Sequence, residues 1–239
     1  MIKPRAPSHS QHAPELNIDF RQRVIVDTAR QAWMASPSSK VWRKPLEREA
    51  AEHGHTTSIV RFEAGSSFPR HEHQLGEEIL VLDGVFSDEH GDWPAGTYLL
   101  NPEGFRHAPF SKPGCVLFVK LRQFPGAGRE HHVIDTNTLD WQSTDIDGIT
   151  RKPLYRQAGF ADVTCLERWA EGAGPGLVTH QQGAEWFILD GEIEDDEGVY
   201  GPGSWLRFPV GATHRPRSAK GCTLYLKLGG LRYLESAAA

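Results

Sequence analysis

The chain has 239 residues, of which 38% are hydrophobic and 24% charged, and its formal net charge is −5. A chain of this length can bury one large core or two small ones. It contains no run of about five like charges, which argues against a nucleic-acid or membrane-surface partner. The first residues include no apolar signal segment, and no stretch approaches about 18 apolar residues, so we expect a soluble protein without a membrane span.

The three cysteines, Cys115, Cys165 and Cys222, lie in apolar, strand-like surroundings and form no C-x-x-C pair. An odd number of cysteines makes a poor disulfide framework. We therefore interpret them as small buried hydrophobic residues. The expected setting is the reducing cytoplasm.

The chain contains a duplicated unit. With an offset of 107 positions, residues 65–121 align with residues 172–228 without a gap, and 22 of these 57 positions are identical. Upstream, "RKPLER" matches "RKPLYR" with an offset of 108. We divide the chain into a polar N-terminal arm (1–23), a first domain (24–122), a linker (123–131), a second domain (132–229) and a C-terminal tail (230–239). The arm is expected to be disordered or to extend a sheet edge.

Each unit consists of short β-branched or aromatic runs, such as "TTSIVRF", "EEILVLDGVF" and "CVLFVKLRQF", separated by turn sequences such as "EAGSS" and "DEHGDWPAG". About six to eight short strands at regular spacing are typical of a sandwich or barrel. Neither unit contains a pattern for an amphipathic helix of three turns. The sequence therefore predicts an all-β protein made of two small barrels.

Four residues of the first unit form a pattern that suits a metal site. His71 and His73 are two positions apart, so in a strand their side chains share a face. Glu77 follows after the turn "QLG", and His107 follows a second turn, "NPEG". An H-x-H pair alone is more often a surface or packing feature. Three imidazoles and one carboxylate together suit Zn²⁺, Fe²⁺, Mn²⁺, Ni²⁺ or Co²⁺.

Residues 65–84 read G-x5-H-x-H-x3-E-x6-G, and residues 96–107 read G-x5-P-x-G-x2-H. These stretches resemble the two motifs of the cupin superfamily. The wording "GEEILVLDGVFSDEHGDWPAGTYLLNPEGFRHAP" is similar to the cupin domain of ChrR-type zinc-binding anti-sigma factors, and the likeness spans nearly all of both units. It implies two tandem double-stranded β-helix (jelly-roll) barrels with a metal ion inside the mouth of the first. The implied ligands are His71, His73, Glu77 and His107.

The chain departs from this family pattern in two places. Ser111 stands where the second motif usually has an asparagine, a position that is not a metal ligand. The helical domain with which such anti-sigma factors hold their sigma factor has no expected counterpart in the roughly 23 residues before the first unit. The resemblance therefore covers the metal-binding half of those proteins.

The second unit retains half of the ligand pattern. The four corresponding positions hold Val178, His180, Ala184 and His214. Glu185, next to the lost carboxylate position, should face away from the histidines because successive residues of a strand point to opposite faces. Two imidazoles make a poor site unless Gln182 or a ligand atom contributes. We expect a degenerate second site and about one divalent ion per chain.

Three functions fit these features. The favoured one is a regulatory or small-molecule-sensing protein, for which the resemblance points to zinc. The alternative is a metal-dependent dioxygenase that acts on a small diketone, hydroxyketone or flavonol-like compound with iron, manganese or nickel. A non-catalytic storage or structural role is the third. The expected partners are a small-molecule ligand and, through edge strands, a second copy of the chain; whether the protein is an enzyme stays open.

Overall fold

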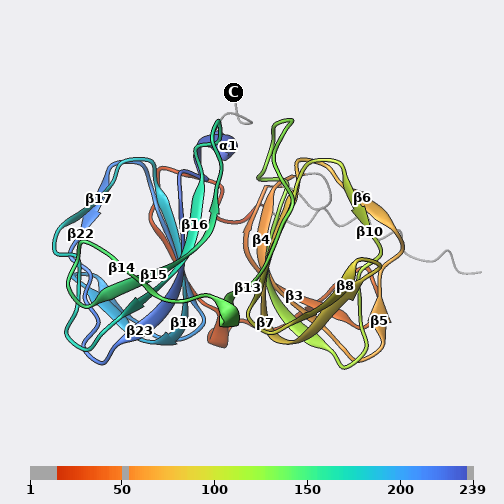
Figure 1. Cartoon of the computed structure of the whole chain (residues 1–239), viewed down its shortest axis with the longest axis horizontal. Helices are drawn as coiled ribbons and strands as arrows, with labels where there is room; N and C mark the ends of the chain where they lie inside the picture. Colours follow the sequence, from red (N-terminus) through yellow and green to blue (C-terminus); the bar gives the residue numbers. More distant parts are fainter. Residues whose placement is uncertain (1–14, 50–53, 236–239) are drawn as a thin grey trace, which may run out of the picture.

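The computed structural model describes residues 15–49 and 54–235, and nearly all regular structure in them is β-strand. Two similar barrels lie side by side (Figure 1). The first repeat contains β1 (Val24–Asp27), η1 (Thr28–Arg30), β2 (Met34–Ala35), β3 (Val41–Arg48), β4 (Thr56–Phe62), β5 (Ser66–Ser67), β6 (His71–His73), β7 (Glu77–Asp88), β8 (Gly91–Pro94), β9 (Thr97–Asn101), β10 (Phe105–His107), β11 (Phe110–Ser111) and β12 (Cys115–Leu121). The second contains β13 (His132–Asp135), η2 (Thr136–Thr138), β14 (Gln142–Ser143), β15 (Ile149–Arg156), β16 (Val163–Trp169), β17 (Val178–His180), β18 (Ala184–Gly191), β19 (Ile193–Asp195), β20 (Gly198–Tyr200), β21 (Ser204–Phe208), β22 (Ala212–His214) and β23 (Cys222–Leu228). One short helix, α1 (Arg232–Glu235), follows.

The two repeats form equivalent sheets. One large sheet has the order β13-β9-β7-β12-β4-β3-β2, with β5, β8 and β11 attached, and the other has the order β1-β21-β18-β23-β16-β15-β14. Small two-stranded sheets, β10-β6 and β17-β22, occupy corresponding places in the two barrels. This arrangement confirms the all-β, duplicated jelly-roll architecture that the sequence predicts.

The barrels exchange their first strands. β1 precedes the first barrel in sequence but pairs with β21 of the second, so that Val24 lies opposite Arg207. In the same way β13 pairs with β9 of the first barrel, with His132 opposite Leu100. Each repeat therefore contributes one edge strand to the sheet of the other, and the two barrels are linked through their backbones as well as their side chains.

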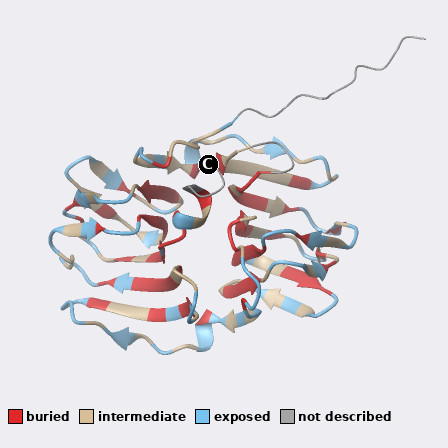
Figure 2. Cartoon of the chain, turned by 90° about the horizontal axis from the view of Figure 1, so that it is seen from above, coloured by how far each residue is buried: buried red, intermediate tan, exposed pale blue. Residues whose placement is uncertain are grey.

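Residues that alternate along β7 belong to two different apolar clusters, one inside the first barrel and one between the barrels. Ile79 and Val81 point into the first barrel, whereas Leu80 belongs to a third apolar cluster that lies between the barrels. In that cluster the rings of Phe118 and Phe187 stack with centroids 4.9 Å apart. Figure 2 shows buried segments along the strands of both barrels and where the barrels face each other. The interface is thus built from the residues that alternate with the barrel interiors.

Among the buried ion pairs between the barrels, two are equivalent in the two repeats. Nζ of Lys120 lies 2.5 Å from Oε2 of Glu185, and Nζ of Lys227 lies 3.2 Å from Oε2 of Glu78. All four side chains are at most 2% exposed. Glu185 therefore faces away from the histidines of its own barrel, as strand alternation predicts. The lysines that recur in both repeats have equivalent partners across the interface.

The segments outside the repeats are also packed where they are described. Phe20 of the N-terminal arm clusters with Leu231 and Leu234 of the C-terminal segment. Phe124 of the linker is fully buried. Residues 1–14, which make up most of the predicted arm, lie outside the described residues. The described part of the arm is thus an integral element of the fold.

All three cysteines are buried and unpaired, which confirms their interpretation as small core residues. Burial raises the pKa of the Cys165 thiol to about 12. Within the described part of the chain, no helix combines the length and the apolar character needed to cross a membrane.

Candidate metal centre

The first barrel brings three predicted ligand residues together on the paired strands β6 and β10. The strands are antiparallel, with His71 opposite His107 and His73 opposite Phe105. Nitrogen atoms of the three histidines lie within 4.8 Å of one another. The Nε2 atoms of His73 and His107 are only 2.8 Å apart. The imidazoles therefore converge on one point.

Glu77 reaches this point because the chain turns sharply between β6 and β7. Gly76 adopts a φ of 72°, and a Cβ atom there would lie 2.8 Å from the carbonyl oxygen of Asn101, so glycine is needed at this position. After the turn, Oε2 of Glu77 lies 3.3 Å from Nε2 of His73 and 3.6 Å from Nε2 of His107. The carboxylate thus contacts two of the three imidazoles.

Outer hydrogen bonds hold the Nδ1 atoms of two of the three histidines. Nδ1 of His107 lies 3.1 Å from Oδ2 of Asp88, and Nδ1 of His71 lies 2.9 Å from the carbonyl oxygen of Pro69. An acceptor at Nδ1 selects the tautomer whose Nε2 lone pair is free for a metal. The donor set and its orientation therefore fit a divalent cation.

The surroundings shift the pKa values of His73 and His107 in opposite directions. Burial lowers the pKa of His73, which favours the neutral ring that a metal requires. Burial also acts to lower the pKa of His107, but the hydrogen bond to Asp88 and the negative charge of Glu77 outweigh it and raise that pKa. The carboxylates therefore surround the imidazoles with negative charge, which favours a bound cation.

Sequence reasoning did not identify two supporting residues, Asp88 and Asn101. The amide Nδ2 of Asn101 donates a hydrogen bond of 2.9 Å to Oε2 of Glu77 and so fixes that carboxylate. A signal was present in the duplication: Phe208 occupies the position of Asn101 in the repeat that has also lost the glutamate. Asp88 was visible only as one of many positions that are identical in the two repeats.

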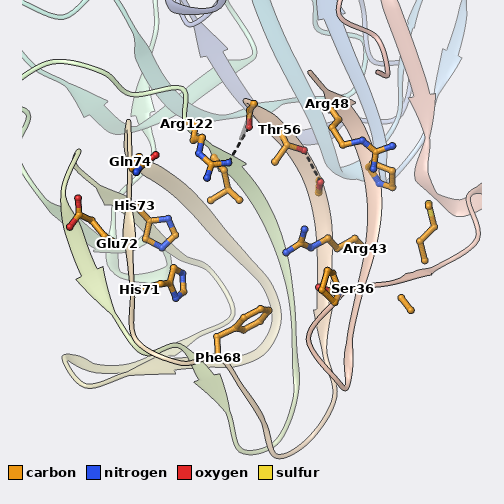
Figure 3. A pocket seen from close by; sticks show the side chains of 17 residues that line it. Ser36, Arg43, Arg48, Thr56, Phe68, His71, Glu72, His73, Gln74 and Arg122 are labelled. Atoms are coloured by element: carbon orange, nitrogen blue, oxygen red, sulfur yellow. Dashed lines mark hydrogen bonds between the residues drawn. The ribbon is translucent and has the colours of Figure 1, made fainter. Parts of the chain in front are cut away.

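A cavity of about 90 Å³ lies beside two of the three histidines, His71 and His73. Its lining includes His71, His73, Glu77, Val60, Phe62, Phe68, Phe86 and Leu117. An outer pocket of about 430 Å³ shares His71 and His73 with the cavity, and Arg43, Arg48 and Arg122 contribute to its lining. Figure 3 shows that the guanidinium group of Arg43 and the two imidazoles point into this space. The site therefore has an apolar inner chamber and a basic mouth.

The second barrel preserves the histidine pair and its support but not the remaining ligands. The Nε2 atoms of His180 and His214 are 2.9 Å apart, and Nδ1 of His214 lies 2.8 Å from Oδ2 of Asp195. Val178 lies opposite His214 in the β17-β22 ladder, where the first barrel has a histidine. Ala184 begins β18 and offers no donor atom. The second barrel therefore has no side-chain donor at the two positions that His71 and Glu77 occupy in the first.

A guanidinium group also lies near this second pair. Arg23 donates from Nη2 to Oδ2 of Asp195 and from Nη1 to Oε1 of Glu197, both at 2.6 Å. Burial, the neighbouring His214 and the charge of Arg23 together lower the pKa of His180 to about 4. Asp195 and Glu197 are therefore engaged by Arg23 and are not free to compensate the charge of a metal cation.

Comparisons with known proteins agree with this architecture. No curated protein sequence matches the chain. A proposed dioxygenase from Nostoc punctiforme PCC 73102 has a similar structure, with 16% identity, a TM-score of 0.72, and coverage of 86% of this chain and 82% of that one. Protein Ylba from E. coli is 14% identical with a TM-score of 0.66, and the similarity covers 90% and 93% of the two chains. A mutant of Bacillus subtilis oxalate decarboxylase is 11% identical with a TM-score of 0.59, covering 86% and 76%. Identities this low establish a shared fold only.

The family comparison is more specific. The family model described as the ChrR cupin-like domain matches the chain twice, at residues 21–125 and 129–232. These two matches cover both barrels and contain all the histidines discussed above. The chain therefore belongs to the ChrR cupin-like family, and it carries two copies of that domain.

Proposed function

We propose that the first barrel binds one divalent metal ion and that a small organic molecule with oxygen donors reaches this ion through the cavity. The observation that carries the proposal is the convergence of His71, His73 and His107 next to a chamber that His71 and His73 line. Structural zinc sites are closed by four protein ligands, whereas sites that act on a substrate keep an open coordination position. The four donors here leave positions open for an ion that prefers six ligands, and His71, His73 and Glu77 line the cavity from which a further ligand would come.

The residues of the site have distinct tasks in this proposal. His71, His73, His107 and Glu77 would hold the ion, which would supply Lewis acidity and a path for electrons between substrate and O₂. Asp88 orients His107, and its hydrogen bond keeps the Nδ1 proton on that ring. The apolar walls of the chamber exclude water from the bound molecule. At the mouth, Arg43 would attract a negatively charged oxygen.

Of the two main candidate activities, the chamber favours the dioxygenase. Apolar walls at Phe62, Phe68 and Phe86 suit the carbon skeleton of a small diketone or hydroxyketone whose two oxygens bind the ion. The regulatory alternative remains a second candidate because the family description is that of ChrR cupin-like domains. The metal distinguishes the candidates: exchangeable iron, manganese or nickel suits the enzyme, and tightly held zinc suits the regulator.

Elemental analysis and oxygen uptake test the proposal together. The purified chain should contain about one divalent ion, which His107→Ala should lose and the matched variant His214→Ala should keep. With iron, manganese or nickel bound, pentane-2,4-dione should cause O₂ consumption that His107→Ala abolishes. Two ions per chain, or loss of the metal in His214→Ala, would contradict the site. One zinc ion per chain without O₂ uptake would contradict the enzyme and favour the regulator.

A further inference from the structure

The second barrel contains a cavity at the place where the first has its metal chamber. Its volume is about 750 Å³, and it is lined by His180 and by two tryptophans, Trp169 and Trp186. The rings of these tryptophans pack edge to face with centroids 5.8 Å apart. Further apolar lining comes from Ile149, Val163 and Leu226. The barrel that lost two metal ligands is thus not filled in.

One residue that lines this cavity, Trp186, has a buried donor without a protein partner among the described residues. Trp186 is only 3% exposed, and its Nε1 forms no hydrogen bond with any residue that the structure describes. By contrast, Trp169 donates from Nε1 to Oε2 of Glu167 at 2.9 Å. A buried N–H group without an acceptor is unfavourable, so an acceptor on a bound molecule would stabilise this donor. A ligand with a hydrogen-bond acceptor near Trp186 would therefore be favoured.

The lining of this cavity also carries excess positive charge. Three arginines, Arg151, Arg156 and Arg232, line it, whereas Glu167 is the only carboxylate among its lining residues. Arg151 is paired with Glu167, with Nε lying 3.0 Å from Oε1. Arg156 is exposed, and it occupies the position that Arg48 has in the other repeat. Charge complementarity thus favours an anion near the opening.

We propose that the second barrel binds, without a metal ion, a small organic acid whose apolar body carries a carboxylate at one end and a hydrogen-bond acceptor at the other. The carboxylate lies near Arg156 at the opening. The body packs on the two tryptophans, and the acceptor receives the N–H of Trp186. No metal ion takes part here because the side chains of Val178 and Ala184 supply no donor atoms. This second binding site is separate from the metal centre and leaves the proposed function of the first barrel unchanged.

A suitable probe is 4-hydroxyphenylacetate, which has the required groups at its two ends. Calorimetric titration of the chain should show saturable binding to one site. The neutral analogue 4-hydroxyphenylacetamide should bind at least about tenfold more weakly, because it cannot form a charge-assisted contact with Arg156. The affinity should be the same with and without EDTA, which separates this site from a carboxylate bound to a metal in the first barrel.

Three variants locate the site. Arg156→Gln should weaken 4-hydroxyphenylacetate binding about tenfold, whereas the matched variant Arg48→Gln should leave this affinity unchanged. Trp186→Phe keeps an aromatic ring but removes the donor, so it should weaken 4-hydroxyphenylacetate and not phenylacetate. Circular dichroism checks that this variant is folded, and Arg156→Gln tests the site independently at an exposed position. Absence of saturable binding at millimolar probe, loss of binding in EDTA, or equal effects of Arg48→Gln and Arg156→Gln would overturn the proposal.

Discussion

Replacing Lys120 with methionine should lower the free energy of unfolding by about 3–4 kcal/mol at pH 7. The ammonium group of Lys120 lies 2.5 Å from Oε2 of Glu185, and the two side chains are 1% and 2% exposed. Breaking a buried pair by removing one partner leaves a charge without compensation, which typically costs about 3–5 kcal/mol. Thr57 loses one contact but still receives a hydrogen bond from Nε2 of Gln123 at 3.0 Å, so the isolated carboxylate dominates the loss.

The size of the loss should depend on pH. The isolated carboxyl group can escape its charge by binding a proton, which for an ordinary glutamate pKa near 4.3 costs about 3.7 kcal/mol at pH 7 and about 1 kcal/mol at pH 5. Because protonation relieves an uncompensated charge in the folded variant only, the variant loses stability as pH rises above the ordinary range of a carboxyl group. Urea unfolding at both pH values should show a defect about 2–3 kcal/mol smaller at pH 5.

Two further variants make the measurement decisive. In Lys120→Met combined with Glu185→Leu, both charges are gone, and most of the lost stability should return. Lys220→Met removes an exposed lysine whose partner is Glu192 and should cost less than about 1 kcal/mol. Two results would refute the reasoning that loss of Lys120 leaves an uncompensated buried charge at Glu185. One is a Lys120→Met defect as small as that of Lys220→Met, and the other is a double variant no more stable than Lys120→Met.

Asp88→Asn should weaken divalent metal binding about 10–100-fold, because the amide no longer orients the bound imidazole as a carboxylate does; a chelator competition titration measures this, and Asp195→Asn should have no such effect. Gly84→Ala should cost more than about 2 kcal/mol in urea unfolding, since φ is 73° and a Cβ atom would lie 2.1 Å from the carbonyl oxygen of Gly114; a change under about 0.5 kcal/mol would contradict the packing. Burial is the main cause that lowers the pKa of His180 to about 4. Its contribution to stability is therefore lost as pH falls from about 6.5 to about 4, and wild type should lose about 2–3 kcal/mol more than His180→Phe between pH 7 and pH 4.5. Equal losses would show that the ring is not held neutral.

The elements that carry the metal centre could be predicted from local patterns. Alternation in "EEILVLDG" places Ile79 and Val81 inside the barrel and Glu78 outside it, and the structure agrees. The convergence of His71 and His107 required only that two short strands pair, which the glycine-rich turns favour. These features depend on residues close in sequence or on one strand pairing.

The exchange of first strands could not be predicted in this way. β1 and β13 have similar sequences, and both barrels offer an equivalent edge, so pairing within a repeat and pairing between repeats use the same residues. The same ambiguity applies to the partners of Lys120 and Lys227. Glu78 and Glu185 occupy equivalent positions in the two repeats, so the sequence does not show which glutamate pairs with which lysine. A sequence repeat specifies which residues are equivalent, but not which copy supplies the contact.

The differences between the two barrels are coordinated, and this argues against random decay of the second site. Where Glu77 and Asn101 form a hydrogen-bonded pair, the second barrel has Ala184 and Phe208, and the ring of Phe208 stacks on His180 with centroids 4.6 Å apart. Loss of the glutamate alone would have left a buried amide without its acceptor, a state that costs free energy. Replacement of both partners removes that cost and extends the apolar interior. The second barrel thus has the packing of a site remodelled for a metal-free interior, while its histidine pair keeps the same hydrogen bond to an aspartate.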